Sequence, residues 1–121
     1  MWIISRDGFI SIVQHKDDPS KFRVRARRIE HLTRTFDITE DDVIDFGPDA
    51  SDYRYHVDID REAVAEELLF SLNDIDYESH AKEAMAGDDR EMYQALMGCW
   101  RNLLGLQREK VPAKTKGRQR A

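Results

Sequence analysis

Three arginines at alternate positions form the first pattern in this sequence that could do chemistry. Arg23, Arg25 and Arg27 lie in segment 22–27, and apolar residues occupy the positions between them. Successive side chains of a β-strand point to opposite faces, so the arginines share one face of a half-exposed strand. Guanidinium groups bind phosphate or carboxylate through paired hydrogen bonds. The row predicts an anion-binding surface, and the alternative is a solvated face whose arginines pair with acids of residues 37–52.

A second alternating segment, 53–59, contributes polar side chains that would lie beside this row if the two strands are neighbours. Arg54, His56 and Asp58 point to the same side of it. His56 and Asp58 suit acid–base catalysis, and with Arg54 they define a small hydrolase or nuclease centred on His56. No serine or cysteine has a recognisable nucleophile motif, which favours a protein without enzymatic activity.

Nucleic-acid binding is the alternative function that the arginine row and a basic tail support. Residues 108–121 carry six bases and one acid, a charge of +5, so the net charge of −5 leaves −10 on residues 1–107. An acidic body repels phosphates at long range. Alternation also predicts that Tyr53 and Tyr55 face away from the arginines, where they cannot stack on bases.

The segment 37–60 holds nine carboxylates and one base, Arg54. Asp41, Asp42 and Asp45 form its centre, and they would suit docking on a basic protein partner, binding of a hard cation, or plain solvation. The spacing lacks the pattern of an EF-hand loop, and the histidines lack the spacing of a zinc site. We therefore expect no metal and no cofactor.

Size and composition indicate one soluble domain. The chain has 121 residues, of which 36% are charged, and one cysteine, Cys99, which excludes an internal disulfide. No apolar run approaches the roughly 20 residues that span a bilayer. We expect a cytoplasmic protein that does not associate with membranes.

The elements that must position these residues form an α+β fold. We expect strands at 2–5, 9–15, 22–27, 43–46 and 53–59, and helices at 28–36, 60–75 and 88–107, with a further short helix considered for 76–86. The order predicts an antiparallel sheet with helices on one face: a permuted ferredoxin-like arrangement with an extra C-terminal helix. It requires strand 22–27 to lie inside the sheet. Residues 1–107 form the domain, and 108–121 a disordered basic tail.

Several short segments carry a resemblance to known proteins: Gly8–Val13, Asp18–Pro19, Val24–Arg27, Asp52–Tyr55, Asp74–Tyr77, and Tyr93 with Trp100 and Leu106–Gln107. In these segments the chain resembles a group of small, uncharacterised bacterial proteins. The resemblance covers residues 1–107 and implies that they form one recurring domain. It implies no reaction and no ligand.

These observations favour a non-enzymatic acidic binding or regulatory module that docks on another macromolecule, with a protein as the expected partner. Small size, charge and lack of catalytic motifs suit an accessory or inhibitor protein of a mobile element. The helix at 88–107 carries the longest apolar stripe in the chain. That stripe predicts a surface through which the protein could form a homodimer.

Overall fold

The computed structural model describes residues 1–76 and 88–108. The short helix considered for 76–86 and the disordered tail predicted for 108–121 therefore lie, apart from their first residues, outside the described residues. The strand predicted at 2–5 has the predicted limits, and the limits of the other elements differ from the predicted ones by up to three residues, as expected for strand and helix ends.

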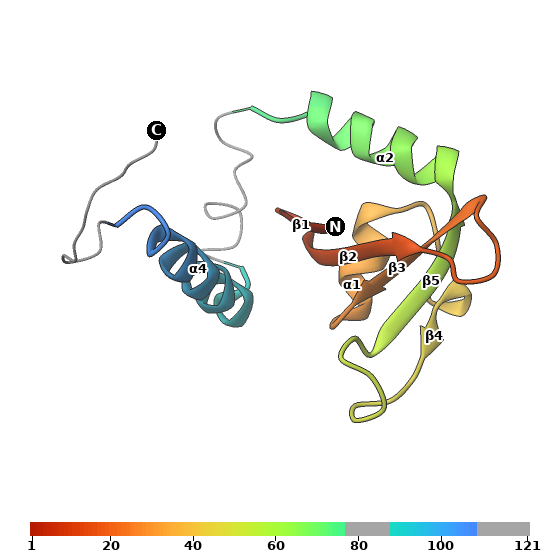
Figure 1. Cartoon of the computed structure of the whole chain (residues 1–121), viewed down its shortest axis with the longest axis horizontal. Coiled ribbons are helices and arrows are strands. Elements are labelled where there is room, and N and C mark those ends of the chain that lie inside the picture. Colours follow the sequence, from red (N-terminus) through yellow and green to blue (C-terminus); the bar gives the residue numbers. More distant parts are fainter. Residues whose placement is uncertain (77–87, 109–121) are drawn as a thin grey trace, which may run out of the picture.

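The described residues form a five-stranded antiparallel sheet in the order β1-β2-β3-β5-β4 (Figure 1). The strands are β1 (Trp2–Ser5), β2 (Gly8–Gln14), β3 (Lys21–Ala26), β4 (Ile44–Asp45) and β5 (Tyr55–Asp60). β3 lies inside the sheet, as the predicted arrangement requires. The chain passes from β3 through α1 (Ile29–Thr35) to β4, on the far side of β5, which is a split β-α-β connection. The predicted α+β class is confirmed.

One face of the sheet holds the hydrophobic core. Strand residues such as Val24 and Val57 are paired across β3 and β5, and both are buried. Leu32 of α1 and Val64 of α2 (Arg61–Asn73) join the same core cluster. Because both helices contribute to one cluster, they cover the same face, and neither covers the other face of the sheet.

The β1–β2 turn is fitted against α1. Gly8 has a φ of +131°, which few residues with a side chain adopt. The ring of His31 lies only 2.2 Å from the position that a Cβ at Gly8 would take. His31 Nδ1 accepts a hydrogen bond from the backbone N–H of Phe9 at 3.3 Å, and burial lowers the pKa of its imidazole. The missing side chain at Gly8 thus leaves room for the neutral His31 ring of α1, which packs against the β1–β2 hairpin.

Two helix ends are built differently from each other. Asp60, a good N-cap by residue type, makes no capping hydrogen bond, and its carboxylate instead pairs with Lys21 Nζ at 2.8 Å. Asp89 does cap α4 (Arg90–Leu104), since its side chain accepts from the N–H of Met92. Figure 1 shows α4 standing apart from the sheet, and no residue of this helix is buried.

Candidate binding surface

The face of the sheet opposite the core, which we call the arginine face, carries most of the candidate residues. One row of partnered residues crosses all five strands: Trp2, Ser11, Arg25, His56 and Ile44. The neighbouring row contains Val13, Arg23 and Asp58. The structure therefore brings the predicted polar residues of β3 and β5 together on one surface.

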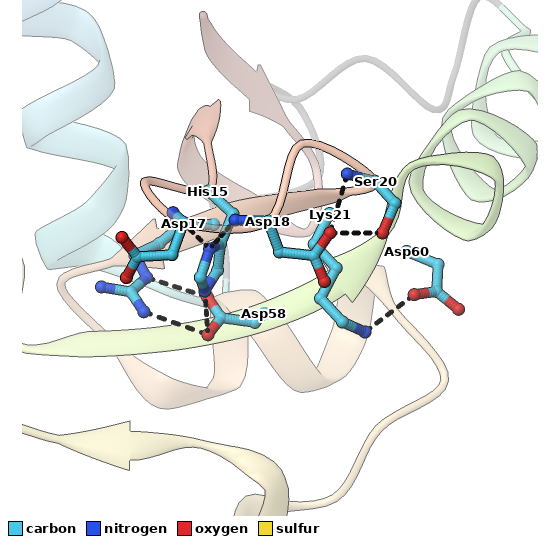
Figure 2. Close-up of polar contacts among 8 residues, drawn as sticks. His15, Asp17, Asp18, Ser20, Lys21, Asp58 and Asp60 are labelled. Atoms are coloured by element: carbon cyan, nitrogen blue, oxygen red, sulfur yellow. Dashed lines mark hydrogen bonds and ion pairs between the residues drawn. The ribbon is translucent and has the colours of Figure 1, made fainter.

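Arg23 is neutralised within this surface. Its Nε and Nη2 donate to the two oxygens of Asp58 at 2.8 and 3.0 Å. The hydrogen bond from Arg23 holds the pKa of Asp58 below its ordinary value. His15 Nε2 lies 3.3 Å from the same carboxylate. Its Nδ1 accepts hydrogen bonds from the backbone N–H groups of Asp17 and Asp18. Figure 2 shows His15 between this turn and Asp58. These contacts hold the β2–β3 turn against β5, and the ion pair with Asp58 neutralises the charge of Arg23.

The described geometry does not assemble the acid–base pair of the hydrolase hypothesis. His56 Nε2 lies 3.0 Å from the carbonyl oxygen of Tyr53 and 3.4 Å from Ser51 Oγ, while Asp58 is engaged elsewhere. Only 8% of His56 is exposed, and burial lowers its pKa. Within the described residues, His56 Nδ1 and Arg25 Nε are buried without a hydrogen-bond partner. The imidazole is positioned as a neutral, buried group of the sheet.

Tyr53 lies on the arginine face, contrary to the prediction from alternation. β5 begins at Tyr55, so Tyr53 belongs to the preceding loop, and the strand periodicity does not apply to it. The guanidinium carbons of Arg25 and Arg27 lie 4.6 and 4.4 Å from the centre of its ring. Arg27 also lies 5.7 Å from the ring centre of Phe9. These distances are within the range of cation–π attraction.

Aromatic rings extend this contact to the edge of the sheet. The ring centres of Phe9 and Tyr53 are 6.3 Å apart, and those of Trp2 and Phe9 are 5.9 Å apart. We call these residues the arginine–aromatic cluster: Trp2, Phe9, Arg25, Arg27 and Tyr53. Sequence reasoning missed the part played by Trp2 and Phe9. The signal was available, because the short β1–β2 hairpin sets the register that puts both on the arginine side.

The two arginines of the cluster differ from Arg23 in their partners. Arg25 Nη2 donates to Ser11 Oγ at 2.8 Å, and Arg27 Nε donates to the backbone oxygen of Asp52 at 3.1 Å. Both acceptors are neutral. In the part of the chain that the structure describes, no carboxylate forms an ion pair with either arginine. Their positive charges are therefore held in place by rings and hydrogen bonds but are not neutralised.

The acidic residues singled out by the sequence lie at and before the β4 edge. Asp45 accepts from Arg54 Nε and Nη2 at 2.8 and 3.1 Å, which holds the pKa of Asp45 low. Asp42 accepts from the N–H of Thr39, and Asp41 is exposed. Arg54 is thus occupied by Asp45. Within residues 1–76 and 88–108, no three acids, histidines or cysteines are grouped so as to hold a metal.

Apolar side chains border the arginine face at both edges. Trp2 is 73% exposed on β1, and Ile44 and Phe46 are 46% and 42% exposed at the β4 edge, where Phe46 packs on the ring of His56.

Comparison of the chain with protein-family models, curated proteins and solved structures finds no match. Among the described helices, none is both long and apolar enough to cross a membrane.

Proposed function

We propose that the protein is a non-enzymatic binding module that docks another macromolecule on its arginine face. The observation that carries the proposal is the pair Arg25 and Arg27, which are stacked on Tyr53 and lack a carboxylate partner among the described residues. Tryptophan, tyrosine and arginine dominate the binding energy of protein interfaces. Side chains already held by neighbours also lose less conformational entropy on binding.

A protein that presents one or two carboxylates among apolar side chains is the partner this surface fits. A carboxylate can accept two hydrogen bonds from one guanidinium, and the exposed Trp2 and Phe46 would cover its apolar surroundings. The acidic segment is the weaker docking surface. Asp45 is already paired with Arg54, and the Asp42 carboxylate accepts a hydrogen bond from the backbone N–H of Thr39 in the same turn.

The test is a pull-down with the tagged full-length chain, followed by mass spectrometry, using two matched charge reversals. Arg27→Glu changes the cluster, and Arg101→Glu changes an exposed arginine of α4 by the same charge. We expect the partner to be lost with Arg27→Glu and kept with Arg101→Glu, with circular dichroism unchanged in both. A partner retained by Arg27→Glu, or lost only when Asp41 and Asp42 are reversed to lysine, contradicts the proposal.

Binding of single-stranded nucleic acid is a second candidate, because Trp2 at the edge of the arginine face is 73% exposed, whereas Tyr53 is covered by Arg25 and Arg27 and is only 5% exposed. An exposed ring beside arginines provides a surface on which a base can stack. Fluorescence anisotropy with a labelled oligonucleotide tests it. A nucleic-acid binder must lose affinity steeply with added salt, and deletion of residues 108–121 must weaken it. Binding that is absent or insensitive to salt eliminates this candidate.

A further inference from the structure

A second surface, independent of the arginine face, is an apolar groove on the helical side of the sheet. It has a volume of about 770 Å³ and lies between β1, α1 and the C-terminal half of α2. Its apolar lining comes mainly from Ile3, Ile4, Ile10, Leu68, Phe70, Leu72 and Ile75. The helix begins on the sheet with the buried Val64, but further along it Phe70 and Leu72 are 71% and 62% exposed, and Ile75, just after its end, is 65% exposed. This groove lacks a covering element in the described structure.

α4 carries the complementary feature. Its apolar stripe consists of Met92, Tyr93, Leu96, Met97, Trp100, Leu103 and Leu104. No residue of the helix is buried, but the members of the stripe differ in exposure. Trp100 and Leu103 are 55% and 63% exposed, whereas the other five are half-buried: Met92, Tyr93, Leu96, Met97 and Leu104. The 13 residues of α2 and the 15 of α4 correspond to about 20 and 22 Å of helix at 1.5 Å per residue. α4 is therefore long enough to lie along the whole of α2, and the exposed part of its stripe lies near its C-terminal end, at Trp100 and Leu103.

The N-terminus of α4 is held outside the groove of its own chain. Arg28, just before α1, pairs with Asp89 at 2.6 Å and also with Glu91. Asp89 at the same time caps the helix. None of the residues that line the groove comes from α4. Each described chain thus presents an anchored helix whose apolar stripe is exposed at Trp100 and Leu103 and, separately, an uncovered groove.

We propose that α4 of a second copy lies in this groove, and that the exchange is reciprocal in a two-fold symmetric dimer. An amphipathic helix in an apolar groove is a common mode of recognition, and a two-fold axis generates two identical contacts. Five of the side chains in one contact are more than half exposed, on the order of 100 Å² each: Trp100 and Leu103 of the stripe and Phe70, Leu72 and Ile75 of the groove. Together with the half-buried members, two such contacts bury on the order of 1,500 Å², the size of a stable specific interface. The proposal does not depend on the function of the arginine face.

Sedimentation of the full-length protein with matched variants tests this arrangement. Leu72→Asp places a charge in the groove, whereas Leu69→Asp changes a leucine of the same helix that is 58% exposed and does not line it. On α4, Trp100→Asp changes the stripe and Asn102→Asp adds the same charge on the opposite side. We expect Leu72→Asp and Trp100→Asp each to weaken dimerisation at least ~100-fold, because each buries a charge in the contact. The two controls should stay dimeric.

Mixing the two disrupted variants gives the most specific result. In a mixed dimer, the native α4 of the Leu72→Asp chain meets the native groove of the Trp100→Asp chain, so one of the two contacts is intact. We therefore expect energy transfer between copies labelled at the single cysteine, Cys99, to reappear on mixing. Circular dichroism verifies that each variant is folded.

Three outcomes overturn the proposal. The wild-type protein could sediment as a monomer at all accessible concentrations, which would place α4 of the same chain or nothing in the groove. Leu72→Asp could leave the dimer intact while Trp100→Asp dissociates it, which would indicate pairing of α4 with α4. The mixture of folded variants could also fail to associate, which would exclude the reciprocal contact.

Discussion

The ion pair between Arg23 and Asp58 gives the sharpest test of how the arginine row is divided between stability and binding. It is made by two hydrogen bonds of 2.8 and 3.0 Å, and the two side chains are 32% and 25% exposed. Fully exposed ion pairs contribute about 0–1 kcal/mol, and hydrogen bonds to charged groups about 1.5–3 kcal/mol. For this half-buried pair we expect a coupling energy of about 1–2 kcal/mol.

A double-mutant cycle of Arg23→Met, Asp58→Asn and the double variant measures that coupling by urea unfolding. Asp58→Asn alone should cost more than the coupling, because the carboxylate also contacts His15. The hydrogen bond from Arg23 lowers the pKa of Asp58 below its ordinary 3.8. Its contribution to stability is therefore fully present above pH 3.8 and is lost as the pH falls through the lowered value in the folded protein. Asp58→Asn should remove this part of the acid sensitivity.

Two results would refute this reasoning. Single variants whose effects add to within about 0.5 kcal/mol would show that the pair is not coupled. Equal loss of partner binding in Arg23→Met and Arg27→Met, with both folded, would show that the row acts as one binding surface. We expect Arg23→Met to keep most of the binding, because its charge is neutralised by Asp58.

Three further predictions concern stability. Gly8→Ala should lower the free energy of unfolding by about 3 kcal/mol or more in thermal denaturation, since a positive φ costs about 1–3 kcal/mol and the Cβ displaces His31; a near-neutral effect would contradict the fit of the turn against α1. Leu32→Ala should cost about 2–5 kcal/mol in urea unfolding because Leu32 is fully buried, whereas Leu69→Ala should stay within about 0.5 kcal/mol. Burial lowers the pKa of His31 and His56 below 6.5, so the unfolded chain takes up protons first and stability should fall as the pH drops below about 6.5. Urea unfolding at pH 7.5 and 5.5 checks this, and His31→Gln should reduce the difference.

The strand arrangement could be predicted because its local signals agree with one another. Polar and apolar residues alternate clearly in 22–27 and 53–59. Turn residues mark the ends of the strands, and these signals agree with one another. The position of β3 inside the sheet followed from the element order. The shared face of the polar strand residues also followed, for Arg23 and Arg25 of β3 and for His56 and Asp58 of β5, since side-chain alternation depends only on the backbone being extended.

The details of the site could not be predicted in the same way, because they depend on register and on loop conformation. Arg23 and Arg27 look equivalent in the sequence, but Asp58 stands opposite Arg23. Tyr53 was assigned to the wrong face because the strand starts two residues later than the alternation suggested. A loop residue has no period, so only the folded chain shows that its ring lies against Arg25 and Arg27.

The charge layout leads to a final prediction about the partner. The two arginines without a carboxylate partner lie on a body of charge −10 over residues 1–107, and the acidic residues 37–52 precede and adjoin the β4 edge of the same sheet. Double-stranded nucleic acid carries a charge every ~1.7 Å, so a polyanion long enough to cover the sheet would meet these acids. A protein partner needs to place only one or two carboxylates against Arg25 and Arg27, between apolar side chains. We therefore expect the affinity for the captured partner to change less than about tenfold between 50 and 200 mM salt, whereas six to ten phosphate contacts would cost about 10³–10⁵-fold. A loss of the latter size in a salt titration would contradict a protein partner on this face and support nucleic acid instead.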